Sequence, residues 1–233
     1  MSISVILEKM ITPVNNNLNN SKKVSFTSVP IFKLKVPKLN KYSYELAPVL
    51  FSKLDSSDPL DKEMVEGCKR RFGLTLSFST LEQSKKDKSS KLSIPALFLH
   101  SCEELKKEYD FFALELPNVT ETGKKILGLM VTRKEKNSEF YGNNTTFVEM
   151  LNVRRGLKKN EFLNFTKRKY KSTGELMMYG IGKLSKKEDC TVALLSGCHA
   201  FYDKIGLSGR TFRKFSPQEL DDFLVKTEKK FNL

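Results

Sequence analysis

The sequence of 233 residues lacks a long apolar run. A helix needs about 20 consecutive apolar residues to cross a bilayer, and no stretch approaches that length. The opening MSISVILEKMI has a short apolar run that Glu8 breaks, and it lacks the basic start of a secretory signal. We interpret residues 1–28, rich in Asn, Ser and Lys, as a flexible polar leader. An organelle transit peptide is the alternative, although the segment contains no Arg.

Paired cysteine motifs are absent as well. The four cysteines form no Cys-x-x-Cys pair: Cys68, Cys102, Cys190 and Cys198. A chain of this length does not need disulfides to fold, so we expect reduced thiols and a cytoplasmic, intracellular protein. Cys198-His199 and His100-x-Cys102 contain residue types that bind metals. Adjacent residues point apart on a helix or strand and no second ligand pair follows, so no metal site is predicted.

Acidic residues are the scarcer charge. The chain has 27 Asp and Glu against 41 Lys and Arg, a formal net charge of +14. This surplus favours polyanionic partners: nucleic acid, a phosphorylated cofactor, an anionic membrane face or an acidic protein. A Lys-rich proteome produces the same surplus, so charge alone does not select the partner. Hydrophobic residues make up 39% of the chain and include 17 Phe, enough for a substantial core.

The first part of the chain predicts a strand and two helices. Residues 31–37 alternate apolar and Lys side chains, which is typical of a half-buried strand. In residues 42–54 apolar side chains recur at helical spacing, and Pro48 strains that prediction without cancelling it. A second helix is expected after Asp58, which is a suitable N-cap followed directly by proline. The Lys-rich residues 81–91 predict a solvent loop or insertion.

The second part predicts three strands, followed by helices and strands in alternation. The strands are expected at residues 110–116, 126–132 and 145–153. The elements after them are expected at 175–189 (helix), 191–196 (strand), 199–205 (short helix), 211–215 (strand) and 216–231 (helix). Ser216, Pro217 and Glu219 predict a capping box for the last helix. The strand-helix-strand unit implies parallel pairing near the end of the chain.

The common nucleotide-binding motifs are also missing. The chain has no GKS or GKT of a Walker loop and no GxGxxG fingerprint. The GxG of YGIGK lies inside an expected helix, where it favours close packing against the sheet. What is present is a strand, a basic loop, Gly174 and the start of a helix. Free backbone N–H groups and the positive end of the helix dipole meet there, which describes a pyrophosphate site.

In this order the motifs resemble those of the GNAT family of N-acetyltransferases, which use acetyl-coenzyme A (acetyl-CoA). FVEMLNV resembles the family's strand, KYKSTG (residues 169–174) stands at its pyrophosphate loop, and AFYDKIGL matches its closing F-Y-[E/D]-K-[LI]-G-[FL] motif. The resemblance covers about residues 110–207. It implies a mixed α/β fold with a central, mostly antiparallel sheet, splayed between strands 4 and 5 and flanked by helices. We expect one GNAT-like domain over residues 29–233, ending in a helix.

The resemblance also implies a site. Tyr202 matches the family's general acid near the sulfur, and Glu149 is the candidate base, directly or through water. The structural alternatives are a core-edge tyrosine and a glutamate paired with a nearby lysine. Backbone groups of Leu151, Asn152 and Val153 are expected to hold the pantetheine arm. The pyrophosphate is expected to contact Lys169 and the backbone N–H groups of Lys171, Ser172, Thr173, Gly174 and Glu175. Ser172 stands where the family has the first glycine of its motif.

These expectations predict an acyltransferase that passes an acetyl group from acetyl-CoA to a primary amine of a protein or small molecule by direct attack. Two alternatives stay open. A degenerate GNAT fold would bind a partner without turnover. A nucleic-acid-binding protein would use residues 154–171, where aromatic side chains interleave with basic ones, although no helix-turn-helix, RNP or zinc-finger pattern occurs. The positive charge disfavours a cationic small substrate.

Overall fold

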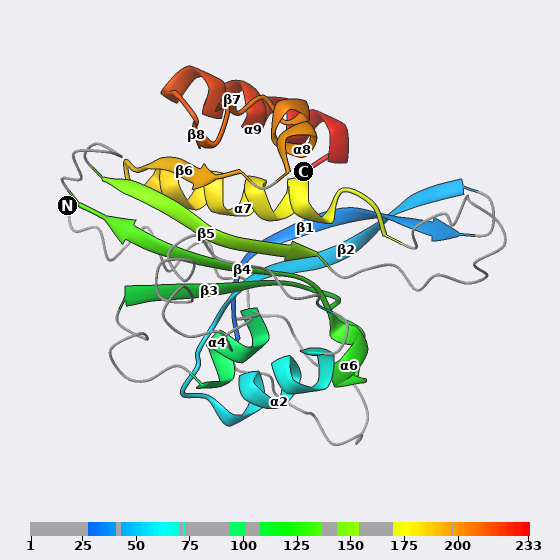
Figure 1. Cartoon of the computed structure of the whole chain (residues 1–233). Coiled ribbons are helices and arrows are strands. Elements are labelled where there is room, and N and C mark those ends of the chain that lie inside the picture. Colours follow the sequence, from blue (N-terminus) through cyan, green and yellow to red (C-terminus); the bar gives the residue numbers. More distant parts are fainter. Residues whose placement is uncertain are drawn as a thin grey trace, which may run out of the picture.

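The structure is a computed structural model and describes residues 28–40, 43–69, 72, 94–100, 108–136, 144–153, 170–196 and 198–233. They fold around an eight-stranded sheet with helices on both faces (Figure 1). The strands are β1 (Val29–Asn40), β2 (Ser43–Leu54), β3 (Tyr109–Glu115), β4 (Ile126–Glu135), β5 (Thr145–Val153), β6 (Thr191–Leu195), β7 (Ser208–Gly209) and β8 (Phe212–Lys214). The helices are α2 (Pro59–Cys68), α4 (Ile94–His100), α6 (Thr122–Lys125), α7 (Thr173–Lys187), α8 (His199–Lys204) and α9 (Pro217–Phe231).

The sheet order is β1-β2-β3-β4-β5-β6-β8-β7. Strands β1 to β5 pair antiparallel in sequence order. Strand β6 lies parallel to β5 across the α7 connection, and β8 pairs antiparallel with β6 and with β7. The predicted fold class is therefore confirmed: a mixed, mostly antiparallel sheet flanked by helices, with parallel pairing where the strand-helix-strand unit was expected.

The helix predicted over residues 42–54 is wrong, because this segment forms strand β2. It pairs with β1 along its whole length, but its pairing with β3 begins only at Leu50. Pro48 lies opposite Lys35 in the part that has no β3 neighbour. A proline is tolerated at such an edge position because its missing N–H removes no ladder bond on the open side. Strand pairing therefore overrides the helical spacing of the apolar residues.

Two hydrophobic cores fill the space between the sheet and its helical layers. The larger lies on the side of α7, α8 and α9, and the smaller on the side of α2 and α4 (Figure 1). Helix α7 comes very close to the sheet at Gly180, where an added Cβ would lie 2.7 Å from Phe51 Cγ. An added Cβ at Gly182 would lie 3.0 Å from Leu220 Cδ1 of α9. The GxG motif thus allows close packing, as predicted.

The predicted helix starts are confirmed where the structure describes them. Asp58 caps α2 by accepting a hydrogen bond from the Leu60 N–H at 2.7 Å. The capping box of α9 is complete on both sides. The predicted loop at 81–91 lies outside the described residues, as does the predicted leader apart from Ser28.

Among the helices of the described ranges, none has the length and apolar character required to cross a bilayer.

Candidate functional site

The sheet opens between β5 and β6. Thr145 to Val148 of β5 pair with Thr191 to Leu194 of β6, and this parallel ladder then stops. Strand β5 nevertheless continues to Val153, paired with β4 on its other side. This is the splay that the resemblance placed between strands 4 and 5; the strands concerned are the fifth and sixth here because β1 adds one strand ahead.

A β-bulge marks the point where β5 leaves β6. Met150 lies opposite Val131 and Val148 lies opposite Thr132, so Glu149 is the extra residue between them. A bulge bends its strand and increases the local twist. The bend comes directly after the last β5–β6 pair, which gives the opening a local cause. Sequence reasoning missed the bulge because the pattern FVEMLNV contains no signal of the pairing on the neighbouring strand.

The start of α7 presents backbone donors. Its N-cap, Ser172, has φ 57° and ψ 18°, and its side chain makes no capping hydrogen bond. The first helical bond of α7 runs from the Leu176 N–H to the Ser172 carbonyl at 3.0 Å. The N–H groups of Thr173, Gly174 and Glu175 precede that bond and have no acceptor within the helix. A left-handed φ is natural for glycine, which explains physically why a glycine suits the position of Ser172.

Gly174 joins three elements of the site. An added Cβ at Gly174 would lie 3.1 Å from Phe201 Cζ of α8 and 3.6 Å from Val153 Cγ1 of β5. The absence of a side chain therefore allows the start of α7, the end of β5 and α8 to meet. The structure brings Val153 and Gly174 together, two of the residues expected to contact the cofactor.

Strand β1 fixes the segment that leads into α7. Tyr170 forms an antiparallel bridge with Lys38, and the Lys171 N–H donates to the Pro37 carbonyl at 2.9 Å. The Lys171 Nζ lies 3.9 Å from the centre of the Tyr44 ring of β2, a cation–π contact. The Lys171 N–H is thus already bonded, so the donors that point away from β1 begin at Ser172. Lys169 lies outside the described residues.

The acidic residue in the first turn of α7 is neutralised. Both carboxylate oxygens of Glu175 accept hydrogen bonds from the Lys230 Nζ of α9, at 2.8 and 2.7 Å. The Glu175 side chain is only 12% exposed. Because this carboxylate has its own cation, it opposes the positive end of the helix dipole less than a free one would.

Tyr202 lies on α8 and belongs to the larger core. Its ring meets Phe201 edge-on, with centroids 4.8 Å apart. Burial raises the pKa of the Tyr202 phenol to about 12, the Cys198 thiol raises it further, and the Arg213 guanidinium lowers it. The phenol is therefore protonated throughout the neutral range, so it is available as a hydrogen-bond donor.

A buried arginine holds α8 in place. Arg213 of β8 is 2% exposed, and its Nη1 donates to Asp203 Oδ1 at 2.6 Å and to the Leu207 carbonyl at 2.8 Å. Its Nε donates to the Arg210 carbonyl at 3.1 Å. Asp203 directly follows Tyr202 in α8, so these bonds also fix the helix that carries the phenol.

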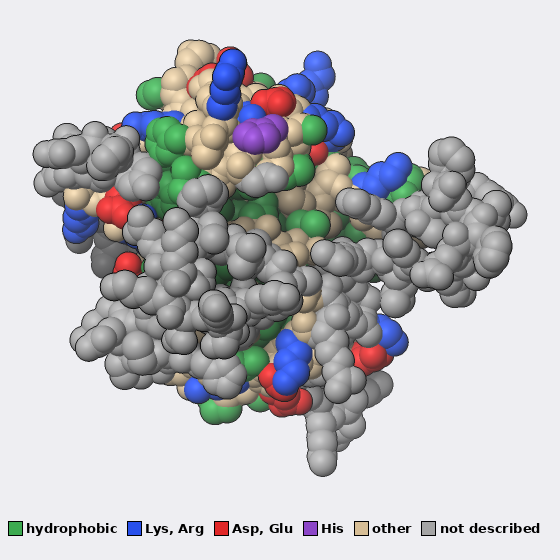
Figure 2. All heavy atoms as spheres, in the orientation of Figure 1, with side chains coloured by type: hydrophobic (Ala, Val, Ile, Leu, Met, Phe, Trp, Pro, Cys, Tyr) green, Lys and Arg blue, Asp and Glu red, His purple; other side chains and the backbone are tan. Residues whose placement is uncertain are grey.

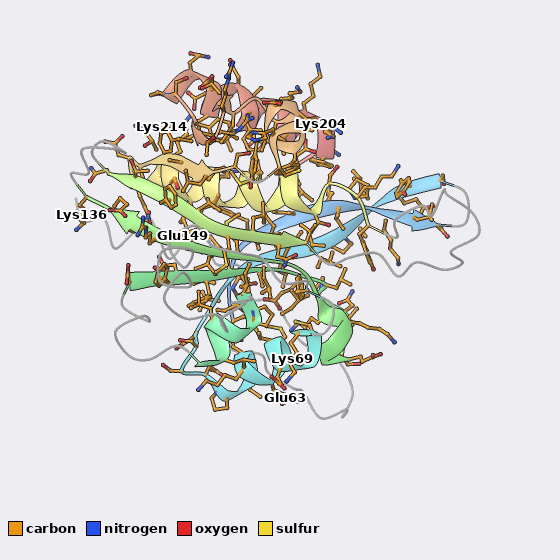
Figure 3. All side chains as sticks on the ribbon, in the orientation of Figure 1. Glu63, Lys69, Lys136, Glu149, Lys204 and Lys214 are labelled. Atoms are coloured by element: carbon orange, nitrogen blue, oxygen red, sulfur yellow. The ribbon has the colours of Figure 1, made fainter. Side chains whose placement is uncertain are left out.

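Glu149 is buried at the bulge with only 4% of its side chain exposed. Its Oε1 lies 2.9 Å from the Arg133 Nε of β4, which also lies 3.0 Å from Glu135 Oε1. The Arg133 guanidinium stacks over the Phe147 ring at 5.1 Å. Figure 3 shows Glu149 on the sheet, apart from the helix α8, whose Lys204 is labelled. The structure therefore does not bring Glu149 next to Tyr202, and the partner of Glu149 is an arginine rather than a lysine.

Basic side chains are dispersed on the face shown in Figure 2, with acidic ones among them. Several lysines of α7 and α9 make ion pairs with acidic residues of the same layer, such as Lys183 with Glu228 and Lys186 with Asp221. Most of the basic segment 154–171 that the nucleic-acid alternative requires lies outside the described residues. Within the described ranges, no group of three or more His, Cys, Asp or Glu residues is placed to hold a metal ion.

No family model matches the sequence, and no curated protein matches it. Solved structures share part of its fold. The glucosamine-6-phosphate N-acetyltransferase of Arabidopsis thaliana is 18% identical, with a TM-score of 0.39 over 70% of this chain and 92% of its own. An acetyltransferase of Trypanosoma brucei is 14% identical, with a TM-score of 0.39 over 70% and 94%. A chain of the KacTA–DNA complex is 10% identical, with a TM-score of 0.41 over 66% and 89%. These values describe a partial likeness of fold, and the substrates of those proteins are theirs alone.

Proposed function

We propose that this chain is an N-acetyltransferase of the GNAT type, which transfers an acetyl group from acetyl-CoA to a primary amine of a protein or small molecule. One observation carries the proposal: the edge of β5 opens at Glu149 and runs to Val153, where it meets Gly174 of α7 and Phe201 of α8. An open strand edge, a helix start with unused donors and a buried phenol are thus combined in one place. An extended, amide-containing ligand that ends in a pyrophosphate fits that combination.

The binding roles follow from the backbone. Leu151, Asn152 and Val153 lie beyond the last β5–β6 pair, so backbone groups on that edge would bond the amides of the pantetheine arm. The N–H groups of Thr173, Gly174 and Glu175 would hold the pyrophosphate, together with the dipole of α7. Lys171 and Lys169 would add positive charge nearby. Acetyl-CoA itself supplies a thioester that an amine can attack directly.

Tyr202 would stabilise the leaving sulfur. A thiol has an ordinary pKa of about 8.5, whereas burial raises the pKa of Tyr202 to about 12. Complete proton transfer from this phenol to a thiolate is therefore uphill. We propose that Tyr202 acts mainly as a hydrogen-bond donor to the developing thiolate, and that its titration does not limit turnover below about pH 10.

Glu149 would receive the proton of the attacking amine, directly or through water. Arg133 competes for the same carboxylate at 2.9 Å, so this role requires the ion pair to loosen when the acceptor binds. The acceptor itself would enter from the side of β5 on which Glu149 lies. The positive charge of the chain disfavours a small polycation in this position.

The compartment follows from the thiols. Cys68, Cys190 and Cys198 are free cysteines, which is usual in a reducing cytoplasm. We propose that location for the protein.

Calorimetric titration with acetyl-CoA tests the proposal. We expect one saturable site in the wild-type chain and loss of at least a hundredfold in affinity in Gly174→Glu. The new carboxylate would repel the pyrophosphate, and its Cβ would press on Phe201. Gln218→Glu is the matched control, because residue 218 is exposed and holds the second position of α9, as Gly174 does in α7. Its affinity should be unchanged.

Circular dichroism of each variant would show whether the fold is kept. No binding by the wild-type chain at millimolar acetyl-CoA would overturn the proposal. Binding without turnover on a broad panel of amines would support the cofactor site and reject the enzyme.

A further inference from the structure

Three ionisable residues are buried together on the side of the sheet opposite α7. Asp61 of α2, Glu115 at the end of β3 and Lys125 at the end of α6 are 0%, 1% and 4% exposed. The Lys125 Nζ lies 3.3 Å from Glu115 Oε2. The proposed acetyl transfer uses none of them, so their burial has another explanation.

Each carboxyl group has one oxygen that is satisfied and one that is not. Asp61 Oδ2 accepts a hydrogen bond from the Asp55 N–H at 2.8 Å, whereas Asp61 Oδ1 has no hydrogen-bond partner within the described part of the chain. Glu115 Oε2 faces Lys125, whereas Glu115 Oε1 likewise has no partner there. Two buried acceptors without a donor are costly, and one proton between them would satisfy both.

The charges lead to the same requirement. With every group ionised, the cluster holds two carboxylates and one ammonium, a net charge of −1 in a buried site. Uncompensated buried charge is strongly unfavourable. One added proton makes the cluster neutral while the Lys125–Glu115 pair is kept.

We propose that Asp61 and Glu115 share one proton in the folded chain, and that this proton locks α2 and α6 onto the end of the sheet in a pH-dependent way. The proposal is independent of acetyl transfer. Below the transition the pair is hydrogen-bonded and the cluster is neutral. Above it the two carboxylates repel each other and the junction is weakened.

The surroundings of Asp61 agree with this assignment. Burial raises the pKa of Asp61 from 3.8 to about 6, the Asp55 N–H lowers it, and the negative charges of Asp58, Glu115 and Asp55 raise it further. Burial lowers the pKa of Lys125, while Glu115 and Asp61 raise it. The groups that act on the pair thus come from the α2 start, β3 and α6.

The sign of the pH effect follows from these values. Between about pH 4 and pH 6 the folded chain holds a proton on this pair that the unfolded chain releases. The contribution to stability is therefore greatest at the acid end of this window and is lost as the pH rises through 6. A shift of about two pKa units corresponds to about a hundredfold change in the unfolding constant.

Chemical unfolding of Asp61→Asn over this pH range tests the proposal. Asparagine keeps an oxygen for the Asp55 N–H and places a permanent N–H donor toward Glu115, so we expect the hundredfold pH dependence to disappear. Asp222→Asn is the matched control, since Asp222 is exposed on α9. It should keep the wild-type pH dependence. A wild-type slope in Asp61→Asn would overturn the proposal.

A second measurement does not depend on the variant being stable. Carboxyl-carbon NMR of the wild-type chain should show an aspartate resonance that titrates near pH 6, and Glu115→Gln should shift that titration downward because one negative charge is removed. If every aspartate resonance titrated near pH 4, the shared proton would be excluded.

Discussion

Helices α7 and α9 invite a direct comparison, because each has 15 residues and each begins after a serine. Ser216 of α9 is extended, and its hydroxyl accepts from the Glu219 N–H at 3.2 Å while Glu219 Oε2 accepts from the Ser216 N–H at 2.7 Å. These two bonds hold the pKa of Glu219 below its ordinary value. Ser172 of α7 is left-handed and caps nothing.

The difference lies in what precedes each serine. Ordinary N-caps need an extended backbone to bring the hydroxyl onto the first-turn N–H groups. The Lys171 N–H is bonded to the Pro37 carbonyl of β1, directly ahead of the left-handed Ser172. One helix therefore satisfies its own donors, and the other keeps them for something outside itself. The comparison predicts that changes around α7 affect ligand and turnover, and that changes at α9 affect stability.

The largest effect should appear at Tyr202, beside the α7 end. We expect Tyr202→Phe to lower kcat roughly a hundredfold with the KM for acetyl-CoA nearly unchanged, because only the developing thiolate loses a donor. Steady-state kinetics with a responsive amine would measure both constants. Tyr179→Phe is a suitable control, since its hydroxyl bonds Glu228 of α9. An unchanged kcat in Tyr202→Phe would return Tyr202 to a purely structural role.

A medium effect should appear at the two serines. Ser216→Ala removes a capping hydrogen bond and should lower the free energy of unfolding by about 1 kcal/mol. Ser172→Ala removes no capping bond and should change it by less than about 0.5 kcal/mol. Urea unfolding of both variants checks the contrast. Equal losses would mean that α7 is capped in solution after all, which would remove the basis of the comparison.

The smallest effect distinguishes the two backbones. Ser172→Gly should stabilise the chain by roughly 0.5 kcal/mol, because glycine adopts a positive φ without the steric cost of a Cβ. Ser216→Gly should destabilise it by a few tenths of a kcal/mol, because the extended cap gains nothing and loses its hydroxyl. Thermal unfolding would resolve the opposite signs. The same sign in both variants would argue against a left-handed Ser172.

The α9 capping box was predictable because all of its signals lie within four residues, Ser216 to Glu219. The AFYDKIGL motif likewise fixed α8 and Tyr202. Features that depend on pairing between distant segments were not predictable. The helix expected over β2 failed because its apolar spacing did not reveal β1 and β3 alongside, and the bulge at Glu149 depends on the register with β4. Asp61, Glu115 and Lys125 come from three separate elements, so no local pattern connects them.

The bridge between Lys38 and Tyr170 has a consequence for the order in which the chain is made. The β1–β2 hairpin leaves the ribosome early, but the residue that pairs with the outer edge of β1 is synthesised roughly 130 residues later. At ordinary rates of translation that interval is on the order of ten seconds. During this time the outer edge of a nascent hairpin is unprotected, and Lys33, Lys35 and Lys38 along β1 supply the charge that discourages premature pairing with other chains.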